Sequence, residues 1–318
     1  MHQLYFHNRY TVMSFAKVVE DAATQRASNR SILRKHTPAD EHSADIAPLI
    51  ERMRKQAPLL KTLAERHHIL IGTQSSAVHD LAEQFERKSE ALIRYVETFP
   101  TLEIPLLFLT SIEEELLRLT KFRFRHVTFR IIMEQLTAAM FDAGRWTQWL
   151  QVIVHNKLPF KSSLVLVLHE RIAYRPETRE TLLRFIDCLD GQPLHIEFEH
   201  WTWNKEGRRQ ELWAALSGRG MLPIGWDGPL LPGIVQRRVV GSRHGAHVRM
   251  LGRNAAGWFD TATKHQYSYT QKELLEFASA LTPERPLYIT LANDPPLRAL
   301  ANAIDLAEVF AAMLKKNV

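Results

Sequence analysis

Short apolar runs alternate with segments of helical character over the C-terminal four-fifths of the chain, from about residue 68 to Val318. Near-continuous apolar runs of this kind are typical of parallel strands that are covered on both faces. Eight strands alternating with about seven helices predict an α/β chain that closes into an eight-stranded β/α (TIM-type) barrel, with an open doubly wound sheet as the alternative. The predicted strands are His68–Gly72, Thr101–Leu109, Phe122–Phe129, Ser163–His169, Leu194–Glu199, Leu222–Trp226, His247–Leu251 and Pro286–Ala292.

Local signals place helices between these strands. Thr270 and Glu273 have the spacing of a capping box, in which each residue satisfies a backbone N–H group of the other. Pro176 stands where the first position of a helix is expected, since proline lacks the N–H group that would be unpaired there. The segment Pro229–Gly241 contains too much proline and glycine for a full helix.

Residues 1–66 are predicted to form a helical, mildly basic extension in front of a barrel domain at 67–318. One helix is expected over Ser14–Ala27, and a second starts at Asp45 and is kinked or restarted at Pro58. The second helix has an apolar stripe, which we expect to dock on the barrel because an exposed stripe would favour association. The stripe consists of Ile46, Leu49, Ile50, Met53 and Leu60.

The positive charge of the chain is concentrated in the same extension. Residues 1–66 hold eleven Lys/Arg and seven Asp/Glu, which is +4 of the formal net charge of +6. This excess suits an acidic partner such as RNA, but a solvated helical face explains it as well, because no block of five like charges occurs.

The compartment is expected to be the cytoplasm, with the matrix of a mitochondrion or another organelle as the alternative. Arg26, Arg30 and Arg34 among serines and threonines resemble a transit peptide, whereas Glu20 and Asp21 count against one. No apolar run approaches the roughly 20 residues that cross a bilayer, so no membrane span is expected. Cys188 is the only cysteine, which excludes an intrachain disulfide framework and a cysteine-rich zinc site.

Candidate functional residues are the polar side chains at the C-terminal ends of the strands, because the loops of a β/α barrel converge there on one mouth. Arginines at this mouth could pair with phosphate or carboxylate oxygens, and an indole could stack on a ring, which suits an anionic or sugar-like ligand. Equally, Glu197 and Arg249 could form a structural ion pair within the barrel. The candidates are Glu103, Glu197, His200, Trp201, Trp203, Asp227, Arg249, Arg253 and Asn293.

Several stretches from residue 68 onward resemble the YecE-like family, which is known only as a domain of unknown function. The matching stretches are "IEFEHWTW" at 196–203, "HVRMLGRNAAGWF" at 247–259, "YSYTQKELLEFA" at 267–278 and "LYITLANDPPLRALANA" at 287–303. The resemblance implies a barrel over about residues 68–318, and it names neither an activity nor a cofactor.

The chain departs from the family pattern at the mouth of the barrel. Pro105, Leu106, Leu168 and Leu251 stand where the family has polar groups. A catalytic site needs its contact residues intact, because one misplaced group lowers the rate by orders of magnitude. The resemblance therefore implies a divergent member that binds or scaffolds.

Two functions remain open from the sequence, and whether the protein is an enzyme is undecided. The first is a non-catalytic binding or scaffold protein, with residues 1–66 contacting a protein or RNA partner in a larger assembly, including an RNA-containing one. The second is a metal-assisted hydrolase of a phosphoester or other anionic substrate. In this hydrolase, Glu197 and Asp227, with Glu103, would hold a metal ion or act as the general base. His200 would be the acid–base partner. Arg249 and Arg253 would stabilise the negative charge that develops on the substrate. No close metal spacing such as His-Glu-x-x-His supports a metal site.

Overall fold

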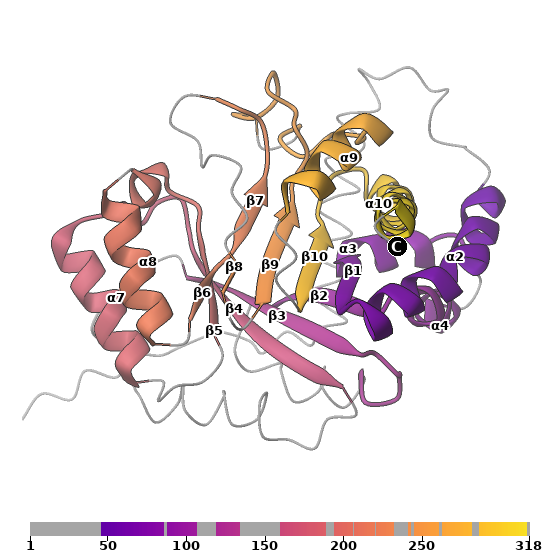
Figure 1. Cartoon of the computed structure of the whole chain (residues 1–318), viewed down its shortest axis with the longest axis horizontal. Helices are drawn as coiled ribbons and strands as arrows, with labels where there is room; N and C mark the ends of the chain where they lie inside the picture. Colours follow the sequence, from indigo (N-terminus) through magenta and orange to yellow (C-terminus); the bar gives the residue numbers. More distant parts are fainter. Residues whose placement is uncertain are drawn as a thin grey trace, which may run out of the picture.

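The computed structural model describes residues 46–85, 88–106, 119–133, 160–188, 194–205, 207–219, 221–231, 241–242, 245–260, 263–281 and 286–316. The predicted helix at Ser14–Ala27 lies outside these residues. The strands form one curved sheet with helices around it, as Figure 1 shows. No helix in the described part of the chain is long and apolar enough to cross a membrane.

The sheet has eight parallel strand positions, in agreement with the predicted barrel. The strands are β1 (Ile69–Gln74), β2 (Thr101–Leu106), β3 (His126–Met133), β4 (Lys161–Leu168), β5 (Leu194–Phe198), β6 (Leu222–Pro223), β7 (Gly225–Asp227), β8 (Gly241–Ser242), β9 (Gly245–Met250) and β10 (Leu287–Leu291). They are ordered β6-β5-β4-β3-β2-β1-β10-β9-β7. Strand β8 is an antiparallel addition to β9, and β6 and β7 share one strand position.

The barrel closes through residues 222–227. Strand β6 pairs with β5, whereas β7, which starts two residues after β6 ends, pairs with β9 on the opposite side. The N–H of Ile224 donates to the carbonyl of Ile196 at 2.8 Å, and the N–H of Leu251 donates to the carbonyl of Asp227 at 2.9 Å. One short segment thus joins the two ends of the sheet.

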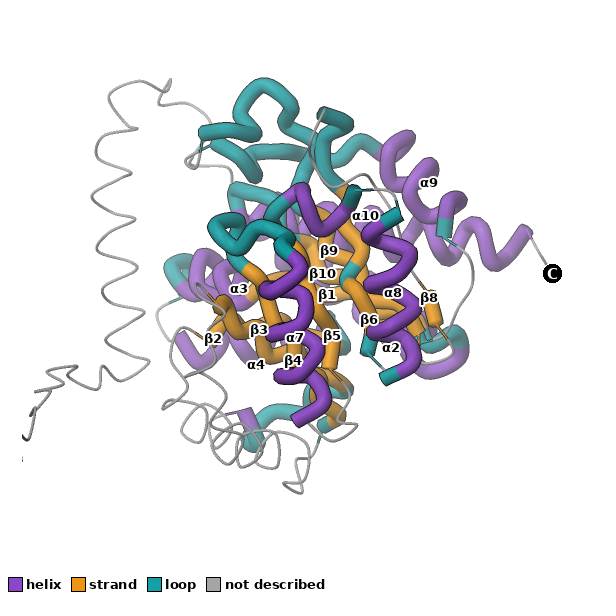
Figure 2. The backbone as a smooth tube through the Cα atoms, turned by 90° about the vertical axis from the view of Figure 1, so that its left-hand side faces the viewer, coloured by secondary structure: helices purple, strands orange, loops and turns teal. Residues whose placement is uncertain are grey.

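The helices lie on the outside of the barrel, where Figure 2 shows them around the strands. They are α2 (Ala47–Arg66), α3 (Ser75–Ala82), α4 (Lys88–Thr98), α7 (Pro176–Cys188), the 3-10 helix η4 (Trp201–Asn204), α8 (Arg208–Gly218), α9 (Gln271–Ala280) and α10 (Pro296–Lys316). The helix start at Pro176 and the capping box of Thr270 and Glu273 are confirmed.

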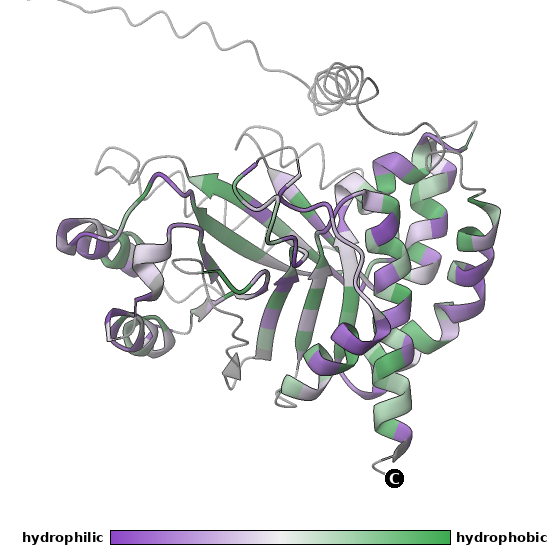
Figure 3. Ribbon diagram, turned by 90° about the horizontal axis from the view of Figure 1, so that it is seen from above, coloured by the Kyte–Doolittle hydropathy of each residue, from purple (hydrophilic) through white to green (hydrophobic). Residues whose placement is uncertain are grey.

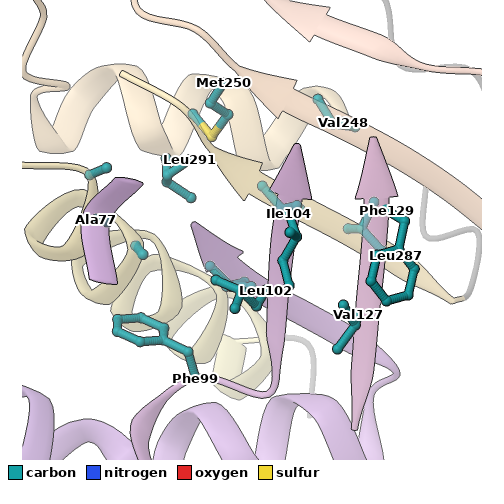
Figure 4. Close-up of a cluster of buried hydrophobic side chains, with 14 of the residues drawn as sticks. Ala77, Phe99, Leu102, Ile104, Val127, Phe129, Val248, Met250, Leu287 and Leu291 are labelled. Atoms are coloured by element: carbon teal, nitrogen blue, oxygen red, sulfur yellow. The ribbon is translucent and has the colours of Figure 1, made fainter. Parts of the chain in front are cut away.

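Alternate residues of each strand point to opposite sides of the sheet, and the two sides differ in chemistry. The outer side packs apolar residues against the helices, and Figure 4 shows Leu102, Ile104, Val127 and Phe129 in this cluster with Phe99. Many residues between them in sequence are buried and polar (see below). Figure 3 shows the result as purple bands that interrupt the green strands. The larger apolar core therefore lies between the sheet and the helices. The interior of the barrel combines the polar side chains with a smaller apolar cluster, which includes Val165, Val167 and Trp226.

Helix α2 packs on the barrel, as its apolar stripe predicts. Met53 and Leu60 are buried in the same core as β1, α4 and α10. Arg52 pairs with Asp305 of α10 at 2.7 Å. Pro58 lies inside α2 and neither ends nor restarts it. Of the two predicted effects, the restart is wrong and the kink stays a prediction. Helix α2 thus shares the core of the barrel. The predicted domain boundary at residue 66 stays a prediction.

The largest error in the predicted strands is at β3, which begins at His126 and not at Phe122. Phe122 and Phe124 are apolar, but they pack into the core from the turn before the strand. Phe124 contacts the rings of Tyr95 and Phe160, each with a centroid separation of 6.4 Å. A turn that contributes aromatic side chains to the core has the same hydrophobic pattern as a strand.

We expect Leu60→Ala in α2 to lower the free energy of unfolding by about 2–5 kcal/mol, because it leaves a cavity between α2 and the barrel. Lys61→Ala, on the exposed face of the same helix, should change it by less than about 0.5 kcal/mol. Urea unfolding of both variants measures the difference. Equal effects would mean that α2 is not part of the folded core.

Candidate functional site

The interior of the barrel holds polar side chains at successive levels along its axis. Side chains from strands that are not neighbours in the sheet contact one another there, so they must meet inside the barrel. The level near the N-terminal ends of the strands has His126, His195, His247 and Tyr288, and the levels above have Glu103, Glu197 and Arg249, then Arg130 and Glu199.

A network of ion pairs crosses the middle of the barrel. Arg249 on β9 donates from Nη1 to Glu197 Oε1 on β5 at 2.6 Å, and from Nε to both carboxylate oxygens of Glu103 on β2 at 3.1 Å. Arg130 on β3 donates from Nε to Glu197 Oε2 at 2.9 Å and from Nη2 to Glu199 at 3.0 Å. Both oxygens of Glu197 therefore accept hydrogen bonds from an arginine. The ion pair of Glu197 with Arg249, one of the two alternatives that the sequence leaves open, is present.

The electrostatics of Glu197 follow from this network. Burial alone would raise the pKa of its carboxyl group, but Arg130 and Arg249 outweigh burial and lower the pKa to about 2. The pKa of Arg249 is raised, because Glu103 and Glu197 outweigh the opposite effect of burial. Glu197 is thus a carboxylate at neutral pH and a weak base, whereas an efficient general acid or base has a pKa near the working pH.

Asp227 belongs to a second cluster at the end of β7. Its two carboxylate oxygens accept from Nε and Nη2 of Arg253, both at 2.8 Å, which is the bidentate arrangement. The hydroxyl of Tyr269 donates to Asp227 Oδ1 at 2.9 Å. Arg253 also lies 3.5 Å from Glu273 of α9. These contacts fix the loop after β9 to β7 and to the start of α9.

His200 and Trp203 stabilise the loop after β5. The Nδ1 atom of His200 accepts the backbone N–H of Thr202 at 3.2 Å and so caps η4, which places the proton of the neutral ring on Nε2. Burial lowers the pKa of His200, and Glu170 opposes this. Trp203 is buried and donates from Nε1 to the carbonyl of Ile172 at 2.6 Å. Of the two tryptophans, only Trp201 is exposed, at 44%.

Asn293, after β10, holds a neighbouring segment in place. Its Nδ2 donates to the carbonyl of Tyr267 at 2.8 Å and to Asn302 Oδ1 at 3.2 Å. Asn302 in turn bonds the backbone N–H and carbonyl of Tyr269. Asn293 Oδ1 is buried and has no hydrogen-bond partner among the described residues.

Arg130, inside the barrel, and His265, on the loop after β9, are two residues of the network that the strand ends do not reveal. Arg130 falls outside the predicted third strand, which ends at Phe129, although a lone arginine two residues after Thr128 signals the same inward face. His265 follows Leu251 by fourteen positions and donates from Nδ1 to its carbonyl at 3.0 Å. Burial, the largest effect, lowers the pKa of His265 to about 4. No sequence pattern marks such a contact between distant loop residues.

Three histidines occupy the level near the N-terminal ends of the strands. The ring centroids of His195 and His247 lie 5.4 Å apart, and those of His126 and Tyr288 lie 4.3 Å apart with the ring planes tilted by 34°. Burial is the main cause that lowers the pKa of His126 to about 3 and of His195 to about 4. The described residues contain no group of three or more His, Cys, Asp or Glu side chains arranged to hold a metal ion.

Comparisons with known proteins match the barrel. The profile of a family described as "Protein of unknown function DUF72" matches residues 70–317. A DUF72 family protein of Thermotoga maritima has a similar structure, with a TM-score of 0.59 and 19% identity over 76% of this chain and 99% of its own. A DUF72 family protein of Enterococcus faecalis gives a TM-score of 0.58 and 17% identity over 76% and 95%. No curated protein sequence matches the chain. The resemblance to the YecE-like family is confirmed, since YecE is the name by which DUF72 is known.

We expect Arg249→Met to lower the free energy of unfolding by about 3–5 kcal/mol, because it leaves Glu103 and Glu197 buried without their shared cation. Arg184→Met, which breaks an exposed pair with Glu180, should cost less than about 1 kcal/mol. Chemical denaturation of both variants measures the contrast. A small effect at Arg249 would show that the network contributes little to stability.

Acidification below pH 6.5 should destabilise the barrel through its buried histidines. Their pKa values are lower in the folded than in the unfolded chain, so the unfolded chain binds more protons between about pH 6.5 and 4, and stability falls as the pH falls. His195 alone should account for about 2 kcal/mol between pH 7 and 5. His195→Gln should therefore flatten the pH dependence of unfolding, and His68→Gln, at an exposed position, should not. The same slope in both variants would contradict this.

Proposed function

Because the chain belongs to the DUF72 family and its interior carboxylates are held by arginines, we propose that it is a non-catalytic binding protein. In this proposal the barrel is a rigid scaffold within a larger assembly. The observation that supports it is the use of both oxygens of Glu197 and both oxygens of Asp227 in hydrogen bonds to arginine.

The alternative, a metal-assisted phosphoester hydrolase, would need these same carboxylates to bind a metal or to take up a proton. Each would first have to leave its arginine, and an arginine left buried without its partner costs several kcal/mol. His200 would also have to give up its capping bond to Thr202 if Nδ1 were the base. The arrangement therefore favours a structural role for these residues.

The surface that we assign to the partner is the basic outer face of α2. Residues 46–66 contain five Lys/Arg and two Asp/Glu, so helix α2 accounts for +3 of the +4 in residues 1–66. Lys55, Lys61 and Arg66 are exposed on this helix, while its apolar side is buried on the barrel. A rigid basic helix suits an acidic partner, including RNA, and its attraction should weaken as salt screens the charges.

The proposal is tested by purifying the tagged protein from its native cell after gentle lysis. The full chain, a chain lacking residues 1–45, and the variant Lys55→Glu/Lys61→Glu/Arg66→Glu are compared for protein and RNA that co-purify in stoichiometric amounts. Lys55→Arg/Lys61→Arg/Arg66→Lys is the matched control, since it keeps every charge. Thermal unfolding verifies that each variant retains its fold.

We expect the charge-reversal variant to lose its partner and the control to retain it, whatever the shorter chain does. The truncation shows whether residues 1–45 contribute as well. Retention of every partner by the charge-reversal variant would overturn the role of α2. Turnover of a phosphoester by the purified protein, lost in a folded His200→Gln variant, would overturn the non-catalytic function.

A further inference from the structure

Three exposed hydrophobic side chains lie on the connections that follow strands at the mouth of the barrel, Trp201 at the start of η4 and the other two on loops. Trp201 follows β5, Leu230 follows β7 and Phe259 follows β9, with exposed fractions of 44%, 69% and 81%. These strands occupy successive positions around the barrel. The other large exposed hydrophobics among the described residues, Ile93 and Leu275, lie on the outer helices α4 and α9. The two large exposed aromatic side chains of the described residues, Trp201 and Phe259, therefore both lie on connections at the C-terminal end of the barrel.

Cationic side chains lie over aromatic rings on the same side of the barrel. The distances from cation to ring centroid are 4.6 Å for Lys205 over Trp201, 4.8 Å for Arg208 over Tyr174 and 4.9 Å for Lys264 over Trp258. The residues belong to the loops after β4, β5 and β9 or to the start of α8. Figure 2 shows a large group of loops, in teal, at one end of the strands.

Lys205 and Lys264 at the mouth have no carboxylate partner among the described residues, whereas the arginines of the outer helices do. Arg52, Arg184 and Arg219 each lie within 2.7 Å of a carboxylate. Within the described part of the chain, Lys205 and Lys264 have ring contacts and no ion pair with a carboxylate. At the same mouth, Glu199 and Asp227 are already paired with Arg130 and Arg253. The positive charge of Lys205 and Lys264 is thus available to an anion. Two exposed carboxylates, Glu170 and Asp260, also lie on the loops of this mouth.

We infer that the mouth of the barrel binds single-stranded nucleic acid. One base stacks on the exposed ring of Phe259, and a second stacks on the part of Trp201 that His200 and Lys205 leave uncovered. Phosphates contact Lys205, Arg208 and Lys264. Aromatic platforms beside cations are the general means of binding a single strand, since every base has a face to stack and every nucleotide a negative charge. The rings belong to loops two strand positions apart, so more than one nucleotide is engaged.

This inference deepens the proposed function, because it gives a binding protein a class of partner and a second surface. The loops can accept a strand without disturbing the ion pairs of the interior. The site lies at the C-terminal ends of the strands, whereas α2 packs beside β1, α4 and α10. The two surfaces can therefore be tested independently.

The test is fluorescence anisotropy of purified full-length protein with a labelled 12-nucleotide single-stranded RNA of unstructured sequence. We expect Trp201→Ala and Phe259→Ala each to weaken binding about tenfold, the range for loss of one stacked base. Lys205→Ala/Lys264→Ala should reduce the slope of log affinity against log salt by about 1.4, since each neutralised phosphate contributes about 0.7. Leu275→Ala and Arg184→Ala, which change exposed side chains on outer helices, are the matched controls.

The inference is overturned if the RNA does not bind, if the control variants weaken binding as much as the mouth variants, or if uridine monophosphate competes as well as the oligonucleotide. Loss of binding in the mouth variants alone supports it. Failure here leaves the role of α2 intact, because that role is measured by partner retention in cells. Conversely, cleavage of the bound RNA would refute the non-catalytic function and leave the binding site in place.

Discussion

The ion pairs of Arg249 with Glu103 and Glu197 determine how the interior of this barrel can be built. Three ionised side chains from β9, β2 and β5 meet where most β/α barrels pack branched aliphatic residues. Such charges are tolerated only when each has an opposite partner and filled hydrogen bonds. Arg130 and Glu199 extend the pairing toward the mouth, and Gln74 completes it by donating to Glu103 at 3.1 Å. The strands are consequently joined by ion pairs across the interior of the barrel as well as by backbone hydrogen bonds within the sheet.

The order of strands and helices could be predicted from the sequence because strands that are buried on both faces appear as near-continuous apolar runs. The same rule explains the errors, since Phe122 and Phe124 are apolar for reasons of packing and lie in a turn. At Pro58 the sequence predicts a kink or a new helix start, whereas α2 continues through this residue. There tertiary contacts of Met53 and Leu60 outweigh the local preference of proline to break a helix.

The candidate site could be predicted as a set of positions but not as an arrangement. Glu103, Glu197 and Arg249 are found by reading the strand ends, yet their pairing depends on the register of strands far apart in the chain. Trp203 and His200 illustrate the limit well, because one is buried against Ile172 and the other caps a short helix. Residue type and place along a strand cannot distinguish a side chain that faces a ligand from one that supports its loop.

The closure of the barrel rests on very little hydrogen bonding. Among the described residues, β6 pairs with β5 at two positions and β7 pairs with β9 at three, whereas β3 and β4 share eight paired positions. The pairing of residues 222–227 with β5 and β9 is therefore weaker than the pairing of β3 with β4. A closed sheet opens most readily where neighbouring strands share the fewest hydrogen bonds, which in this barrel is at the strand position of β6 and β7. If this pairing breaks, the remaining strands still form one continuous open sheet. The loop with Leu230 follows β7, so it lies next to the place where the barrel would open.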